Sequence, residues 1–361
     1  IAEHTIPPNS EYVLGLVVAM NIMHVFTDFI PSILVGAPHP DNYLSALPGH
    51  KLVLEGHGLD AMRYAIAGCL FGTVIACLLI PVYVQLAEQF ATKWHAFVAP
   101  VLLLSLILLV ASERGLDKKA WAIAVILLSG ALGFFCLTHY PDALFPLVTG
   151  FFGIPTILFA LQNTALPVQQ TALTPLDWKK ILPVCALGSV AGSLVTYFPA
   201  LSPSHAAFLA TTIRRMDPRS FLCLLGSLNA SATLYSFIAL AVLNKARTGS
   251  AATLAHVHPL VPADIGIVVG ITLFCAGIAG YATLALTQKA LVASRAFNPR
   301  HAGIALLGFL LLLVGLWNGA TGIAICVVAS AIGCIPSIVN IRRSHLMAFL
   351  IAPTLSYYIH L

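Results

Sequence analysis

Residues 304–317 read IALLGFLLLLVGLW, and this run carries no charged residue. Ala96–Ala111 and Ile181–Phe198 are equally continuous apolar runs without a charge. In lipid every backbone polar group must be hydrogen-bonded within the protein, so only helices or closed barrels cross a bilayer. The apolar residues here do not alternate with polar ones, which excludes an outer-membrane barrel. The runs therefore predict an all-α polytopic membrane protein.

The composition of the whole chain supports this prediction. Of its 361 residues, 59% are hydrophobic and only 9% are charged, and the mean hydropathy is +0.94. Soluble domains carry roughly 25% charged residues, so a soluble protein this poor in charge would lack the polar groups to cover its surface. All eight cysteines fall within apolar stretches and none forms a C-x-x-C pair. We therefore expect no metal site, no disulfide, no cofactor and no nucleic-acid partner.

The apolar runs predict about 11 transmembrane helices with broken segments, and one re-entrant half-helix. A spanning helix needs about 20 apolar residues, and the half-helix Pro203–Ile213, which follows the break Phe198–Pro203, is too short to cross. The expected spans are Tyr12–Gly36, Ala61–Ala87, Ala96–Ser112, Ala120–Thr138, Ala143–Leu161, Ile181–Phe198, Ser220–Leu243, Ala263–Thr287, His301–Trp317, Thr321–Ile341 and Ser344–Ile359.

The Lys and Arg residues indicate the orientation in the plasma membrane. If the half-helix returns to the side it came from, three basic residues (Lys93, Lys245 and Arg247) lie on one side and 15 on the other. If the chain crosses there instead, the division becomes 9 against 9. Cytoplasmic loops carry the excess of Lys and Arg, so we expect the re-entrant hairpin and a C-terminus outside. The 15 residues are Lys51, Arg63, Arg114, Lys118, Lys119, Lys179, Lys180, Arg214, Arg215, Arg219, Lys289, Arg295, Arg300, Arg342 and Arg343.

Weak matches between the two halves of the chain predict a duplication. In the expected topology the matched segments cross in opposite directions, which gives the inverted repeat that is common among secondary transporters. We expect a first repeat at 1–163 that lacks its N-terminal hairpin, a cytoplasmic linker at 164–180 and a second repeat at 181–361. The matches, with offsets of 208, 200 and 198, are Asn21–Phe29 with Asn229–Phe237, Gly133 with Gly333, and Pro155 with Pro353.

The half-helix opens with Ser202, Pro203, Ser204 and His205. Ser is favoured at the N-cap and Pro at the first helical position. The free N–H groups and positive dipole end of a helix N-terminus attract anions. We expect these four residues to bind a carboxylate or phosphate of a substrate. The alternative is a capped helix end packed in protein, with only water bound.

Asp28 is the only acidic residue well inside an expected span, and Asn21, His24 and Asp28 share one helix face. Ionisable residues within a membrane are costly and generally functional. We expect these three residues to bind a coupling Na⁺ or H⁺. The alternative is a purely structural contact with one another or with backbone freed by Pro31. On the matched helix, Asn229 is the expected substrate contact.

Glycine and proline interrupt several expected spans. They indicate hinges or a pathway, although Gly and Pro also occur in membrane helices for packing alone. The segment Gly36–Asp60, rich in Pro, His and Gly, is expected to be a cytoplasmic loop that serves either as a gate or as an ordered connector. The expected hinge or pathway residues are Pro31, Gly153, Pro155, Gly333 and Pro336.

Several motifs resemble the large permease of the tripartite tricarboxylate transporters (TctA type), in its archaeal branch. The resemblance covers nearly the whole chain and is most specific at Pro48–Gly56. It implies a secondary carrier for small organic anions that works with a small membrane subunit and an extracytoplasmic binding protein. The family's Pro-Gly-x-x-Pro-Asn motif is altered at Pro199–Ser204, which has Ala200 for Gly and Ser204 for Asn. The motifs are Phe26–Ile33, Gly36–Pro38, Leu47–Gly56, Leu144–Leu147, Gly150–Thr156, Phe198–Ala207 and Arg342–His345.

Three classes of function follow from these features. The first is an ion-coupled secondary transporter, or permease, for small organic anions such as di- or tricarboxylates. The alternative is a translocase for polyprenyl phosphate or another lipid phosphate, which would use the same anion site. An enzyme is not expected, because the chain has no H-E-x-x-H, G-x-S-x-G or P-loop motif. It would need a pair such as His139 with Asp142 to meet.

Overall fold

The computed structural model describes residues 10–35, 43–90, 94–140, 142–161, 169–170, 175–197, 203, 206–207, 216–293 and 299–359. The regular elements in these ranges are helical, which confirms the predicted all-α class. The helices are α1 Ser10–Thr27, α2 Tyr43–Leu54, α3 Gly58–Phe90, α4 Trp94–Ala111, α5 Leu116–His139, α6 Leu144–Val148, α7 Ile154–Ala160, α8 Trp178–Val195, α10 Pro218–Leu243, α11 Gly249–Val257, α12 Ile265–Ala293, α13 Pro299–Ile338 and α14 Ala348–Ile359. Shorter turns are the π-helical η1 Pro31–Val35 and η2 Thr149–Gly153, and the 3₁₀ turns η3 Pro262–Asp264 and η4 Arg343–Met347.

Seven helical stretches of the described chain are long and apolar enough to cross a membrane. Shorter apolar helices occupy Phe97–Ala111 and Leu144–Phe159. The figure of 11 spans therefore stays a prediction, and so does the re-entrant half-helix, which lies mostly outside the described residues. The seven stretches are Glu11–Leu34, Gly58–Gln89, Leu116–His139, Trp178–Val195, Pro218–Leu243, Pro262–Ala293 and Gly303–Ile338.

Helix α13 contains a reversal of chain direction at Gly319. The φ and ψ angles of this residue are 61° and −158°, outside the helical region. A methyl group at Gly315 would lie 3.3 Å from Cδ1 of Ile323. Residues eight apart in a straight helix are separated by about 12 Å, so the chain must fold back here. Gly319 thus divides α13 into two arms, at the place where the sequence separates His301–Trp317 from Thr321–Ile341.

The segment Gly36–Asp60 is not simply the loop that its Pro and Gly content suggested. It contains α2, which includes Pro48 and Gly49. Leu52 and Val53 of this helix are buried in the hydrophobic core. Burial of these side chains outweighs the poor helix propensity of Pro and Gly, so the expectation of a loop was wrong for Tyr43–Leu54.

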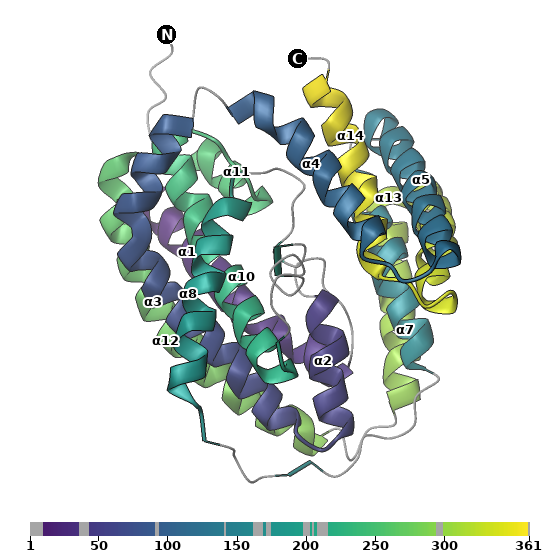
Figure 1. Ribbon diagram of the computed structural model, residues 1–361, viewed down its shortest axis with the longest axis horizontal. Helices are drawn as coiled ribbons and strands as arrows, with labels where there is room; N and C mark the ends of the chain where they lie inside the picture. The colour runs from purple at the N-terminus through teal and green to yellow at the C-terminus, as the bar shows by residue number, and fades with distance from the viewer. Residues whose placement is uncertain are drawn as a thin grey trace.

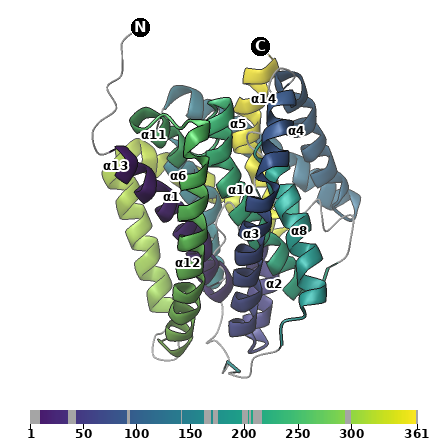
Figure 2. The ribbon, with the colours of Figure 1, turned by 90° about the vertical axis from the view of Figure 1, so that its left-hand side faces the viewer.

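The helices form two groups that lie side by side (Figure 1). The first group comprises α1, α2, α3, α8, α10, α11 and α12, whose buried side chains form one hydrophobic core. The second group comprises α4–α7, α13 and α14 around separate clusters. Each group takes helices from both the first and the second half of the chain. In Figure 2 the beginning of α1 and the end of α14 lie at the same end of the molecule.

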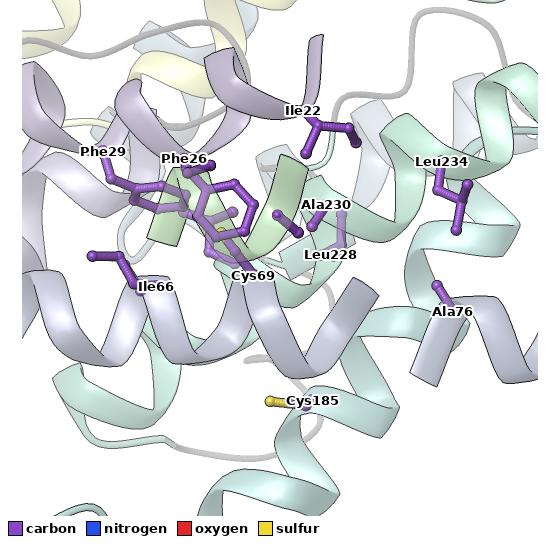
Figure 3. Close-up of a cluster of buried hydrophobic side chains, with 14 of the residues drawn as sticks. Ile22, Phe26, Phe29, Ile66, Cys69, Ala76, Cys185, Leu228, Ala230 and Leu234 are labelled. Carbon is purple, nitrogen blue, oxygen red and sulfur yellow. The ribbon is translucent and has the colours of Figure 1, made fainter. Parts of the chain in front are cut away.

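Helix α10 is the centre of the first group. Every residue from Phe221 to Ala241 is buried except Thr233. Figure 3 shows its core side chains, among them Leu228 and Leu234, beside residues of α1, α3 and α8. Close approach to α3 depends on glycine, because a methyl group at Gly68 would overlap the carbonyl oxygen of Cys223. Small residues allow the same intimate contact in membrane helix pairs generally.

Two related glycine contacts hold the second group together. A methyl group at Gly133 of α5 would overlap the carbonyl oxygen of Phe349 in α14, and one at Gly333 of α13 would overlap that of Phe151 in η2. The rings of Phe151 and Phe349 lie 5.2 Å apart between their centroids. Gly133 and Gly333 are one of the matched pairs of the predicted duplication. The repeat boundaries themselves stay a prediction.

Large apolar side chains cover much of the outer surface. Exposed examples occur on α4, α12 and α13, and water is a poor solvent for so many of them. They are the surface that a bilayer would cover. Among them are Leu104, Ile107, Phe274, Leu312, Leu316 and Trp317, which are between 53% and 79% exposed.

We expect Gly68→Ala to destabilise the protein by about 1–3 kcal/mol, because the added methyl group forces α3 and α10 apart. The control is Gly270→Ala on α12, where nothing lies within 4 Å of the added methyl group and the better helix propensity of Ala is expected to stabilise slightly. Thermal unfolding in detergent, followed with a thiol-reactive dye that reports exposure of buried cysteines, measures both. Equal unfolding temperatures for the two variants would contradict the close contact between α3 and α10 at Gly68.

Candidate functional site

A cavity of about 350 Å³ lies in the first helix group, between α1, α10 and the turn that leads into α11. Most of the side chains around it are polar or charged, although it lies among the helices of an apolar protein. We call it the polar cavity. It is lined by Asn21, His24, Val25, Asp28, Pro203, Asn229, Ala232, Thr233, Arg247, Thr248, Gly249 and Ser250.

Helix α1 contributes the face that its sequence spacing predicted. Asn21, His24 and Asp28 all line the polar cavity, and Nδ1 of His24 lies 3.1 Å from Oδ1 of Asp28. The His24 side chain is 57% exposed, whereas that of Asp28 is 15% exposed. The pair therefore has one exposed partner, His24, and one largely buried partner, Asp28.

The helix geometry changes at Asp28. Helix α1 ends at Thr27, and the π-helical turn η1 begins at Pro31. Pro31 has no N–H to donate, and the carbonyl oxygen of Asp28 accepts a bond of 2.9 Å from the hydroxyl of Ser32. π-helical turns inside helices are frequent at functional sites. The break places the Asp28 carboxylate at the junction of two helical segments.

Helix α10 supplies the opposite wall. Asn229 and Thr233 both line the cavity, and residues four apart lie on the same helix face. Asn229 is 4% exposed. Thr233 interrupts the long buried run of α10 because it faces the cavity. The structure thus brings Asn229 together with Asn21, His24 and Asp28 around one cavity, and their roles in binding stay a prediction.

The third wall is the turn between α10 and α11, and sequence analysis did not identify it as part of a site. Arg247 was counted only as an outer charge, and Thr248 and Ser250 were not considered. A signal was present, because Thr followed by Gly-Ser before an apolar run is typical of a helix start. The sequence did not reveal that this helix packs against α1. Its Ser250 hydroxyl donates a bond of 2.9 Å to Oδ1 of Asn21.

Of the four residues predicted to open the half-helix, the structure describes only Pro203. Pro203 is buried and lines the polar cavity. Ser202, Ser204 and His205 lie outside the described residues, so their role at an anion site stays a prediction.

The predicted hinge residues lie elsewhere, and none lines the polar cavity. Pro31 begins η1, close to Asp28 along the chain. Gly153 ends η2 and Pro155 lies in the first turn of α7. A methyl group at Gly333 would lie 2.8 Å from the ring of Pro155, so these two residues meet, while Pro336 lies near the end of α13.

His139 and Asp142 have separate contacts. Nδ1 of His139 lies 2.9 Å from the carbonyl oxygen of Phe135. The backbone carbonyl of Asp142 accepts a bond of 2.9 Å from the amide of Asn318. The first contact lies within α5, and the second connects the turn before α6 to α13, so neither joins His139 to Asp142.

The polar cavity combines both signs of charge with neutral hydrogen-bonding groups. Among its described lining residues, Asp28 carries a negative charge, Arg247 a positive charge, and His24 becomes positive when protonated. With His24 neutral the two charges balance, and one bound proton makes the site net positive. Such a site suits a small anion whose binding depends on a bound proton or cation.

Comparison with known proteins gives a family but no structural template. Residues 4–348 match the family described as the tripartite tricarboxylate transporter TctA family. The chain is also 27% identical over 358 residues to an uncharacterized protein of Methanocaldococcus jannaschii, an alignment that covers 96% of this chain and 88% of that protein. No solved structure matches the chain. The resemblance that the sequence motifs indicated is confirmed.

We expect Asn21→Cys with Ser250→Cys to be joined by a short thiol cross-linker in membranes, in a background whose native cysteines are replaced. The reason is the direct contact between these two side chains. The matched control combines Leu16→Cys with Ser250→Cys, because Leu16 is on the same helix but is 69% exposed. The cross-link is measured on a gel after the chain is cleaved between residues 21 and 250, because only a cross-linked protein then keeps its two fragments together. Equal cross-linking of both pairs would refute the placement of α11 against α1.

Proposed function

Because the chain belongs to the tripartite tricarboxylate transporter TctA family, we propose that it is a secondary active permease for di- or tricarboxylates, coupled to protons. The observation that supports this most directly is the polar cavity, which is enclosed by α1, α10 and the α11 turn and contains Arg247 beside the His24–Asp28 pair. Its volume of about 350 Å³ is at the lower end of the range for ligand pockets. It therefore favours a small organic anion over a lipid phosphate with its long chain.

The His24–Asp28 pair is the proposed coupling group. Histidine is the side chain whose ordinary titration range is closest to physiological pH, and ionisable groups within membranes form the proton relays of many transporters. A proton taken up by the pair from the extracytoplasmic side adds one positive charge to the cavity. That charge favours an organic anion, so proton and substrate bind together and cross together.

The predicted inverted repeat supports a transport mechanism in which the site faces each side in turn. Secondary transporters with this plan hold the substrate where the repeats meet and rock one part against another. The polar cavity is lined by helices of both halves, α1 from the first and α10 and α11 from the second. In the second helix group, Gly133 likewise approaches Phe349 and Gly333 approaches Phe151, so residues from the two halves of the chain pack together there too.

The family's tripartite character suggests the setting of the protein. We propose that it lies in the plasma membrane with its C-terminus outside, and that it works with a small membrane subunit. An extracytoplasmic binding protein would deliver the anion to the side on which Lys245 and Arg247 are expected.

We expect the purified protein in proteoliposomes to exchange radiolabelled citrate or another di- or tricarboxylate across the membrane, since exchange needs only the cavity and its access to both sides. An acidic exterior should add net accumulation, because protons then enter with the anion. Absence of exchange and of ligand-induced thermal stabilisation for every carboxylate tested would refute the proposed function. Accumulation driven by Na⁺ but not by protons would refute the proposed coupling ion.

We expect Asp28→Asn to abolish proton-driven accumulation but to retain carboxylate exchange, because exchange moves no net proton. The matched control is Asp142→Asn, which removes an exposed carboxylate outside the cavity and should leave both activities unchanged. Initial rates with and without a pH gradient separate the two readouts. Normal accumulation by Asp28→Asn would show that the pair does not couple transport.

A further inference from the structure

We propose that Arg247 binds a carboxylate group of the transported anion. This inference rests on the proposed function and identifies the cavity residue that recognises the substrate. It differs from the sequence-based expectation, which gave anion binding to the opening of the half-helix. The argument uses only the described walls of the polar cavity.

The position of Arg247 is fixed by the ends of two helices. Helix α10 ends at Leu243 and is capped by Asn244, whose left-handed conformation (φ 51°, ψ 35°) turns the chain and whose N–H donates to the carbonyl of Leu240. Helix α11 is capped by Thr248, whose side chain accepts a bond of 3.2 Å from the N–H of Ala251. Arg247 directly precedes this cap. The two caps therefore fix the backbone at Arg247, which lines the polar cavity.

The α11 turn is also attached to the opposite wall. The hydroxyl of Ser250 donates to Oδ1 of Asn21, while the amide nitrogen of Asn21 donates a bond of 2.8 Å to the carbonyl of Val17. Both hydrogen-bonding ends of the Asn21 amide are therefore used within the wall. Arg247 thus lies in a turn that is hydrogen-bonded to the helix of His24 and Asp28.

The chemistry of the cavity assigns the anion to Arg247. Among the described lining residues Arg247 is the one with a permanent positive charge, and it is half-buried. A guanidinium group presents a planar fork of donors that matches a carboxylate with two parallel hydrogen bonds. The hydroxyls of Thr248 and Ser250 are bonded within the wall, since that of Thr248 lies 3.2 Å from that of Ser250 and the latter donates to Asn21. Asp28 cannot take this role, because its carboxylate repels an anion and is bonded to His24.

The test compares Arg247→Gln, Arg247→Lys and the control Lys245→Gln, which alters an exposed charge of the same turn that does not line the cavity. We expect Arg247→Gln to raise the half-saturating concentration for citrate exchange about 10- to 100-fold, since a charge-assisted contact is lost. Arg247→Lys should fall between Arg247→Gln and the wild type. Lys245→Gln should stay within about twofold of the wild type.

A charge-rescue experiment separates substrate binding from a structural role. Arg247→Cys, in a background without native cysteines, is treated with a methanethiosulfonate reagent that carries either an ammonium or a sulfonate group. We expect the ammonium group to restore much of the exchange and the sulfonate group to leave it impaired, with unfolding temperatures in the absence of citrate equal for both. Equal activity of the two adducts, or a normal half-saturating concentration in Arg247→Gln, would overturn the proposal.

The outcomes distinguish this inference from the proposed function. A wild-type protein that neither exchanges nor binds any carboxylate refutes the proposed function, and the role of Arg247 with it. A wild-type protein that exchanges citrate while Arg247→Gln does so equally well refutes only the assignment to Arg247.

Discussion

The absence of hydrogen-bonding partners in lipid is the constraint on which this structure depends. A helix that breaks within a bilayer leaves backbone groups that only the protein interior can satisfy. In the described part of the chain, the break between α1 and η1 and the cap at Thr248 both lie at the polar cavity. The protein thus gathers polar backbone and polar side chains at one place. The same constraint that imposes helices on the fold also locates its polar cavity.

The contacts around α10 show why this site has a stable wall. The hydroxyl of Ser189 donates to the carbonyl of Gly72 at 3.0 Å, and that of Ser227 donates to the carbonyl of Cys185 at 2.6 Å. Methyl groups at Gly72 or Gly188 would lie within 3 Å of Ser227. Small residues let α3, α8 and α10 approach closely and exchange hydrogen bonds, which is how helices associate where lipid supplies no hydrophobic driving force. Asn229 and Thr233 project from this compact unit.

Sequence reasoning located the parts of the site that depend on periodicity within one helix. Asn21, His24 and Asp28 were found because spacing on a helix specifies a shared face, and Asn229 because it matches Asn21. Arg247 was missed because its role depends on how a connecting turn folds against α1, and no local pattern encodes that contact. Helix α2 was missed for a related reason, since tertiary burial of Leu52 and Val53 overrides the signals of Pro48 and Gly49. Hydropathy was sufficient to place the helices along the chain. It does not give the number of transmembrane helices, because that number depends on where the bilayer lies.

The walls of the polar cavity are unequally buried, and they differ in what it costs to separate them. Helix α10 is buried along nearly its whole length, so its displacement would expose many apolar side chains at once. Helix α11 buries only Ala251 and Leu254, and its Ser250–Asn21 bond is worth about 0.5–1.5 kcal/mol. Moving α11 away from α1 is therefore far less costly than moving α10 away from α3. An anion bound by Arg247 would take part in this balance directly, because Arg247 is next to the N-cap of α11. The α11 turn is thus the wall of the polar cavity that separates at the lower cost, and it is also the wall that carries Arg247.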